Sequence, residues 1–124
     1  MIKNKVEERK RKRKKIKMRI RKKIHGTAEM PRLIVNKTGK YIYAQAIDDD
    51  KGKTIASSSS LEKEIKGERV SAKNVEIAKK VGETIAEKLI KLGVEKVVFD
   101  RNGFIYHGKI KAIADGAREK GLKF

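Results

Sequence analysis

A run of seven consecutive cationic residues, from Arg9 to Lys15, limits how much of this 124-residue chain can form a hydrophobic core. Residues 1–24 contain 14 of the 34 lysines and arginines but only two acidic residues, so they carry +12 of the net charge of +18. Because like charges repel and little apolar surface offsets them, such a segment gains little by folding alone. Its natural counterion is a polyanion, above all a nucleic acid. The remaining 100 residues must supply the core, and they are enough for one domain.

The basic segment also has some helical character. Three isoleucines recur at every fourth position and form a narrow apolar stripe: Ile16, Ile20 and Ile24. Gly26 can end this helix, and Pro31 favours an extended chain around it. We therefore expect a basic arm over residues 1–26, helical or disordered when free, and a single domain over residues 27–124. A stripe without Trp or Phe would anchor poorly at a membrane surface, which favours nucleic acid over membrane as the partner.

The domain sequence alternates short apolar runs with turn residues before it becomes helical. Strands are predicted at residues 33–35, 41–47, 54–58 and 97–99, and helices at residues 75–92 and around residues 110–117. The first three strands are joined by short turns and should form an antiparallel meander. A helix between the third and fourth strands makes a crossover, so the fourth strand should lie parallel to a neighbour. The expected fold is α/β, with a mixed sheet of three antiparallel strands plus one parallel strand, packed with two helices. Gly82 and Ala86 thin the apolar face of the first domain helix, which should permit its close approach to the sheet.

Three adjacent acids, Asp48, Asp49 and Asp50, raise the possibility of a metal-dependent nuclease. Adjacent side chains on a strand point to opposite faces, so these carboxylates cannot all converge on one ion. A turn explains them better, and a nuclease would also have to recruit Asp100 and Asp115 from elsewhere in the fold. We therefore expect no enzyme activity.

Other kinds of chemistry find little support in the composition. The chain has no Cys, which excludes disulfides and thiolate metal sites, and its two histidines, His25 and His107, lie far apart in the sequence. No metal or cofactor is expected. The basic run is not followed by the apolar stretch of a signal peptide, and no stretch approaches the roughly 20 apolar residues of a membrane span. We expect a soluble, intracellular protein.

Residues 100–109 form an unusual loop directly after a predicted buried strand. This segment combines two aromatic rings, an imidazole and two cations, which are groups that can stack on unpaired RNA bases or bind phosphates. A simpler interpretation is an Asn-Gly turn with Phe104 and Ile105 completing the core. We assign Phe104 to the core, and Arg101, His107 and Lys109 to a contact surface.

Two long segments and the arm resemble a known family. These are VVFDRNGFIYHGKIKAIADGAREKGLKF (residues 97–124), PRLIVNKTGKYIYAQAIDDDKGKTIASSSS (residues 31–60) and the basic arm that leads into KIHGTAEMPRL. In this order and spacing they closely resemble the family of the eighteenth large-subunit ribosomal protein of bacteria. The family more often has Arg, His and Arg at Met30, Tyr41 and Lys109. Lys109 keeps the charge but loses the bidentate fork of Arg.

The resemblance implies a structural ribosomal protein that binds 5S rRNA and mediates its attachment to 23S rRNA in the central protuberance of the large subunit. It also implies a cytoplasmic location in the ribosome, neighbouring 5S-binding ribosomal proteins as partners, and a monomer when free. The RNA-binding residues that it implies are Arg9, Lys10, Arg11, Lys12, Arg13, Lys14, Lys15, Arg19, Arg21, Lys22, Lys23, Arg32, Asn36, Lys37, Thr38, Lys40, Tyr43, Arg101, Phe104, Tyr106, His107 and Lys109. The residues alone leave a general nucleic-acid chaperone, a DNA-compacting protein or a nuclease as alternatives.

Overall fold

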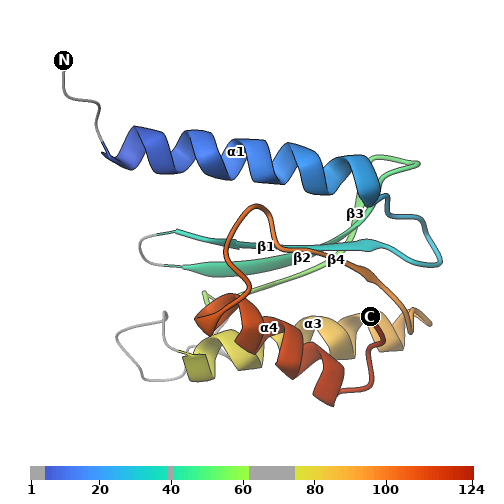
Figure 1. The fold of residues 1–124 in the computed structure, drawn as a ribbon. Helices are drawn as coiled ribbons and strands as arrows, with labels where there is room; N and C mark the ends of the chain where they lie inside the picture. The colour runs from blue at the N-terminus through green and yellow to red at the C-terminus, as the bar shows by residue number, and fades with distance from the viewer. Residues whose placement is uncertain (1–4, 39–40, 62–74) are drawn as a thin grey trace.

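The computed structural model describes residues 5–38, 41–61 and 75–124. Its elements are, in order, α1 (Lys5–Lys23), β1 (Arg32–Lys37), β2 (Ile42–Asp48), β3 (Lys53–Ser59), α3 (Val75–Lys91), β4 (Val98–Asp100) and α4 (Gly108–Glu119) (Figure 1). The strands form one sheet in the order β3-β2-β1-β4. Strand β2 is antiparallel to both of its neighbours, whereas β4 lies parallel to β1. The predicted mixed α/β fold is confirmed.

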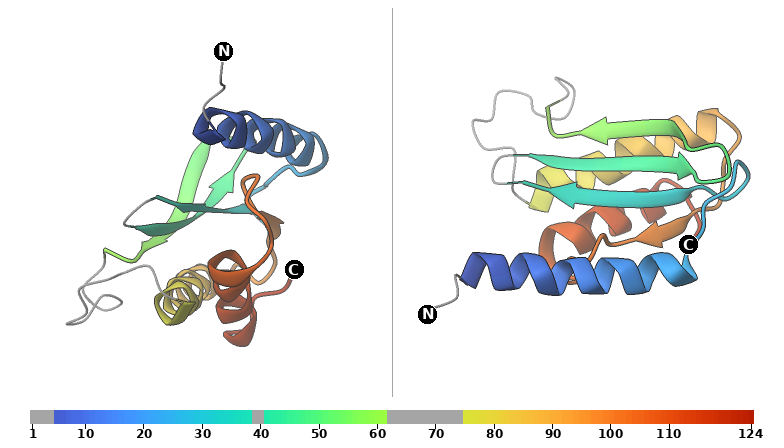
Figure 2. Two further views of the ribbon diagram at one scale, coloured as in Figure 1. Left: turned by 60° about the vertical axis from the view of Figure 1, so that its left-hand side comes forward. Right: turned by 90° about the horizontal axis from the view of Figure 1, so that it is seen from above.

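The domain has two layers, with the basic helix outside them. Helices α3 and α4 lie together on one face of the sheet, and α1 lies on the other side and runs along the β4 edge (Figures 1 and 2). Along β2 the buried side chains alternate with less buried ones, as expected for a strand with one covered face. The buried set faces α3 and α4, where it packs with apolar residues of β1 and of both helices: Leu33, Val35, Ile42, Ala44, Ala46, Val81, Ile85, Leu89, Ile110 and Ile113.

The thin part of α3 also serves a contact that was not expected. A Cβ added at Gly82 would lie 2.0 Å from the carbonyl oxygen of Ile113 in α4, and one added at Gly116 would lie 2.2 Å from that of Lys79 in α3. The two glycines therefore allow the helix backbones to approach each other. Helix α3 also lies close to the sheet, because Ser58 Oγ of β3 donates to the Val81 carbonyl oxygen (3.0 Å). Both contacts form because α3 and α4 share one face of the sheet and must also pack side by side.

Strand β1 extends further than the sequence predicts. Asn36 and Lys37, expected in a turn, pair with Tyr43 and Ile42 of β2. The turn itself is therefore shorter, with Thr38 and Tyr41 hydrogen-bonded through their backbones (N···O 2.8 Å). This pairing fixes which face of the sheet each of these side chains occupies.

Candidate nucleic-acid interface

A concave surface lies between α1 and the loop before α4. It has a volume of about 920 Å³ and lies where the first half of α1 faces the loop. This surface, which we call the basic groove, is lined by Val6, Arg9, Lys10, Lys12, Arg13, Ile16, Lys37, Val75, Gly103, Phe104, Ile105, His107, Gly108 and Lys109. It brings together predicted contact residues from three separate segments of the chain. The sequence did not predict this grouping.

Gly103 makes the contact between α1 and the loop possible. Its φ is +77°, and a Cβ at this position would lie 2.5 Å from the carbonyl oxygen of Arg13. An L-residue here would be strained and would also collide with α1. Asn102 before it also has a positive φ, of 54°. The predicted Asn-Gly turn is therefore present, and it forms the surface on which α1 lies.

Phe104 joins the three segments of the groove. The Arg13 guanidinium lies 4.5 Å from the centre of the Phe104 ring, and the Lys37 ammonium lies 5.4 Å from it. Arg101 Nη1 donates to the Phe104 carbonyl oxygen (2.8 Å) and holds the loop in shape. The ring packs partly against the core, as predicted, while the cations gather at its open face. The arrangement holds positive charge at a fixed place beside an apolar floor.

Apolar side chains at the groove were missed by the sequence reasoning. Ile105 is 79% exposed and Val6 is 52% exposed, although both are aliphatic. The simpler interpretation of this loop, in which Ile105 also completes the core, is wrong for Ile105 because the loop turns its side chain outward. A sequence signal existed, since Ile105 lies inside a segment already singled out for its rings and cations.

A second set of predicted residues lies on or beside the sheet. Asn36 and Tyr43 are cross-strand partners, and the alternation along β2 places Tyr43 on the face opposite α3 and α4. The Tyr43 ring meets Tyr41 edge-to-face at 6.2 Å. Thr38, in the turn, is exposed, and its hydroxyl accepts a hydrogen bond from the Tyr41 amide (3.1 Å). These groups form a polar and aromatic surface at the turn end of β1 and β2.

Arg32, a predicted RNA contact, is instead enclosed by carboxylates. Its Nε and Nη2 donate to Asp49 (2.9 Å each) and its Nη1 donates to the fully buried Asp100 (2.8 Å). The hydrogen bonds from Arg32, more than any other contact, lower the pKa of Asp49 to about 2. The same bonds raise the pKa of Arg32. Only 9% of Arg32 is exposed, so its guanidinium is directed toward these two acids.

The acidic triplet is a turn that anchors the arm. Asp48 is buried, and its carboxylate accepts a hydrogen bond from the Asp50 backbone amide (3.0 Å), as is common in turns. Asp49 accepts from the Gly26 amide (2.8 Å), and Asp50 contacts His25 Nε2 (2.6 Å), which raises the pKa of His25. The three carboxylates thus have three different partners. Within residues 5–38, 41–61 and 75–124, no group of three or more His, Cys, Asp or Glu could hold a metal ion.

The remaining predicted residues fall into three sets. Four cations are exposed along α1, outside the groove lining: Arg11, Lys14, Lys15 and Arg19. Tyr106 is exposed and accepts a hydrogen bond from Arg118 Nη1 (3.1 Å). Lys40 and the side chains of Arg21, Lys22 and Lys23 lie outside the described part of the structure.

Comparison with known proteins decides the family. The model of a family described as ribosomal L18 of archaea, bacteria, mitoch. and chloroplast matches residues 7–124. The chain belongs to the ribosomal L18 family. Among relatives in this family, the large ribosomal subunit protein uL18 of Dictyoglomus thermophilum is 60% identical over 116 residues, which cover 94% of this chain and 95% of that protein. The uL18 protein of Brachyspira hyodysenteriae is 55% identical over 123 residues, covering 99% of this chain and 95% of that protein.

Membership of the L18 family settles the class of function. L18 proteins are structural proteins of the ribosome and not enzymes, so the predicted non-enzymatic role is confirmed and the nuclease hypothesis is wrong. The carboxylates that suggested a nuclease serve the fold, because Asp49 and Asp100 pair with Arg32. Among the described residues, no helix combines the length and apolarity that a membrane span needs.

Proposed function

We propose that this L18 protein binds 5S rRNA and mediates its attachment to 23S rRNA in the central protuberance of the large ribosomal subunit. The observation that carries the proposal is the basic groove, where α1, β1 and the loop before α4 converge. Residues 1–26 act as the RNA-binding arm, and the domain formed by residues 27–124 supplies the second wall of the groove. Other 5S-binding ribosomal proteins are its neighbours.

The groove suits RNA in two respects. Its cations from α1, together with Lys37 and Lys109, can neutralise several phosphates, and each neutralised phosphate releases counterions and gives affinity without reading sequence. Its exposed apolar groups, Ile105 and Val6, offer surface for a ribose or an unstacked base. Phosphates would therefore give most of the affinity, and the fixed shape of the groove would give the selectivity.

The predicted contacts divide into direct and indirect roles. We assign Phe104, Lys37 and the α1 cations to direct contact, together with Asn36, Thr38 and Tyr43 at the turn end of the sheet. Arg32 acts as a positioning residue, because it binds Asp100, which directly precedes the loop, and Asp49, which accepts a hydrogen bond from the arm. Tyr106 is also a positioning residue, because its hydroxyl accepts a hydrogen bond from Arg118.

Binding to 5S rRNA, compared with a shuffled RNA of equal length across a range of salt concentrations, tests the proposal. We expect a preference for 5S rRNA that persists at salt concentrations where the shuffled RNA dissociates. If both affinities fell together with the same slope, the chain would be a general nucleic-acid binder, the alternative that the exposed cations of α1 favour.

A matched pair of variants locates the site. Lys37→Ala should weaken binding and lower the slope of log K against log salt by about one, as expected for the loss of one phosphate contact. Lys51→Ala removes the same charge from the turn between β2 and β3, outside the groove, and should leave the slope unchanged. Equal effects of the two variants would contradict a role for the groove.

A further inference from the structure

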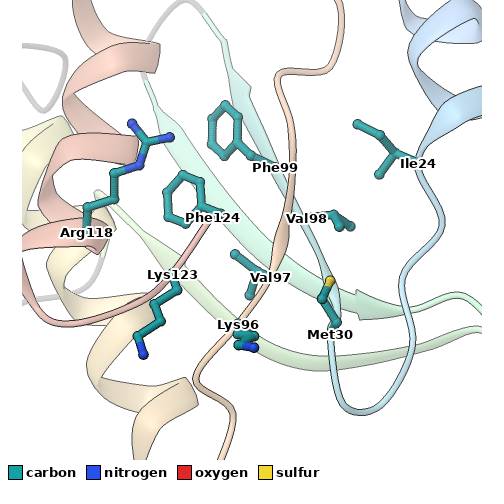
Figure 3. Close-up of a pocket in the computed structure, with 9 residues that line it drawn as sticks. All are labelled: Ile24, Met30, Lys96, Val97, Val98, Phe99, Arg118, Lys123 and Phe124. Atoms are coloured by element: carbon teal, nitrogen blue, oxygen red, sulfur yellow. The ribbon is translucent and has the colours of Figure 1, made fainter.

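A second pocket lies at the other end of α1, beside the edge strand β4. It has a volume of about 560 Å³, within the roughly 300–1,000 Å³ of ligand clefts. Figure 3 shows the side chains that surround it, which come from the segment after α1, from β4 and the residues before it, and from the C-terminus. They are Ile24, Met30, Lys96, Val97, Val98, Phe99, Arg118, Lys123 and Phe124. None of these nine belongs to the predicted RNA contacts, so the pocket raises a separate question.

The floor of the pocket is apolar and held in place. The Phe99 and Phe124 rings stack with their centres 5.5 Å apart and an interplanar angle of 14°. The Arg118 guanidinium lies 4.3 Å from the centre of the Phe124 ring, within reach of a cation–π contact. Backbone hydrogen bonds from Val97 to Lys123 (3.1 Å) and from Lys123 to Glu95 (2.9 Å) fix the C-terminus against β4. The surface is therefore formed before any partner arrives.

The rim of the pocket is cationic. Lys96, Lys123 and Arg118 lie beside the apolar floor, on the side away from Ile24 (Figure 3). Arg118 donates to Tyr106 through Nη1, and a guanidinium has further N–H groups that can bind a carboxylate. None of the nine lining side chains, all of which the structure describes, carries a carboxylate, amide or hydroxyl group. The side chains of the pocket thus offer apolar contact and hydrogen-bond donors, and any acceptor must come from the backbone.

We propose that this pocket is a docking site for a protein segment that carries a large apolar side chain flanked by Asp or Glu. The apolar side chain would lie on the Phe99–Phe124 stack, and the flanking carboxylates would pair with the three cations. This choice follows from charge complementarity at the rim together with the apolar floor.

A nucleobase fits the pocket less well. Every base presents amino or imino N–H groups as well as acceptors, and buried N–H groups without acceptors cost free energy. The lining side chains supply donors at the rim and no oxygen acceptor. An apolar side chain needs neither donors nor acceptors, and carboxylates beside it can accept hydrogen bonds from the cations at the rim.

The two concave surfaces can be occupied together. The basic groove involves α1 residues up to Ile16, whereas the pocket begins at Ile24, beyond the end of the helix. The docking proposal therefore does not rest on RNA binding, and either one can fail without the other.

A matched pair of methionine variants makes the proposal testable. Met30 is 40% exposed in the pocket wall, and Met18 is 57% exposed on α1 outside the pocket. Met30→Glu and Met18→Glu therefore change the net charge equally, but only the first places a carboxylate where acidic flanks should bind. Circular dichroism and thermal unfolding should show that both variants are folded.

The probe is a displayed library of random twelve-residue peptides, selected on the full chain at physiological salt after depletion on the Met30→Glu variant. We expect enriched peptides with an apolar residue between carboxylates. Fluorescence polarisation should show at least tenfold weaker binding of these peptides to Met30→Glu and unchanged binding to Met18→Glu. If Met30→Glu does not fold, Lys123→Glu takes its place, with Lys51→Glu as its control.

Three results would overturn the proposal. One is a selection that enriches no such peptides. Another is enriched peptides that bind Met30→Glu as tightly as the unchanged protein, which would indicate attraction to α1 alone. The third result concerns a labelled single-stranded hexaadenylate. If it bound Met30→Glu more weakly but Met18→Glu unchanged, and the peptides did not bind, the pocket would be a nucleobase site.

Discussion

Arg32 shows how a residue chosen for its charge can serve the architecture of the site. Its two partners, Asp49 and Asp100, lie 17 and 68 residues away along the chain, and Asp49 also accepts from the Gly26 amide. One guanidinium thus connects the end of the arm, the β2–β3 turn and the start of the loop that forms the groove. Sequence spacing gives no sign of this cluster, because each pair is brought together only by the sheet.

Replacing Arg32 should destabilise the domain strongly. Arg32→Ala removes one partner of the buried ion pair with Asp100, and breaking a buried pair in this way costs about 3–5 kcal/mol. Arg19→Ala removes an exposed arginine of α1 and should change the free energy of unfolding by less than about 0.5 kcal/mol. Urea denaturation measures both. A similar small loss for the two variants would mean that Arg32 is not part of a buried network.

The pKa of Asp49 predicts how stability depends on acid. The folded pKa of about 2 lies below the unfolded value of about 3.9, so the ionised carboxylate stabilises the fold above about pH 4. This contribution should be lost as the pH falls from about 4 through about 2. Asp49→Asn should be less stable than the unchanged protein at pH 6, and the difference should shrink toward pH 2. A difference that stayed constant between pH 6 and pH 2 would show that ionisation of Asp49 does not matter.

At the scale of elements, local patterns predicted most of the fold. The strands and helices of the domain lie within a few residues of their predicted positions, because alternation and helical periodicity are local properties. The errors concern contacts between elements. The contact of Gly82 with α4 and the contact of α1 with Gly103 were not predicted, since both depend on where distant elements pack.

The contact at Gly103 can be separated from the strain of its backbone. Gly103→Ala places a methyl group 2.5 Å from the Arg13 carbonyl oxygen, whereas Gly52, with a similar φ of +60°, has nothing within 4 Å. Both substitutions should cost about 1–2 kcal/mol for the left-handed conformation. Only Gly103→Ala should also displace α1, which hydrogen exchange of the α1 amides would show as reduced protection. If Gly52→Ala lowered α1 protection equally, the effect would come from general destabilisation and not from the contact.

At the scale of the whole molecule, charge and core are separated along the chain. Among the described residues, the buried core cluster runs from Leu33 to Leu122, and the described side chains of α1 contribute none of its members. The sequence predicted this separation from charge alone and also identified the arm and the loop of residues 100–109, which supply most of the groove lining. It could not predict that the arm, Lys37 and the loop meet around Phe104, because that requires the geometry of the β4 edge.

Deleting residues 1–24 should therefore leave a folded domain that binds RNA poorly. The deletion removes 14 of the 34 lysines and arginines and one wall of the basic groove, but no member of the core cluster. Circular dichroism should show a cooperative thermal transition, while 5S rRNA affinity should fall by roughly 100-fold or more, with a shallower salt dependence.

A full-length control with residues 9–15 all changed to Gln keeps good helix formers but loses seven charges. If the control binds as poorly as the deletion, charge is what the arm supplies. If it binds much better, contacts of the helix itself matter. An unfolded truncation would place the arm within the folding unit and contradict the boundary at residue 26.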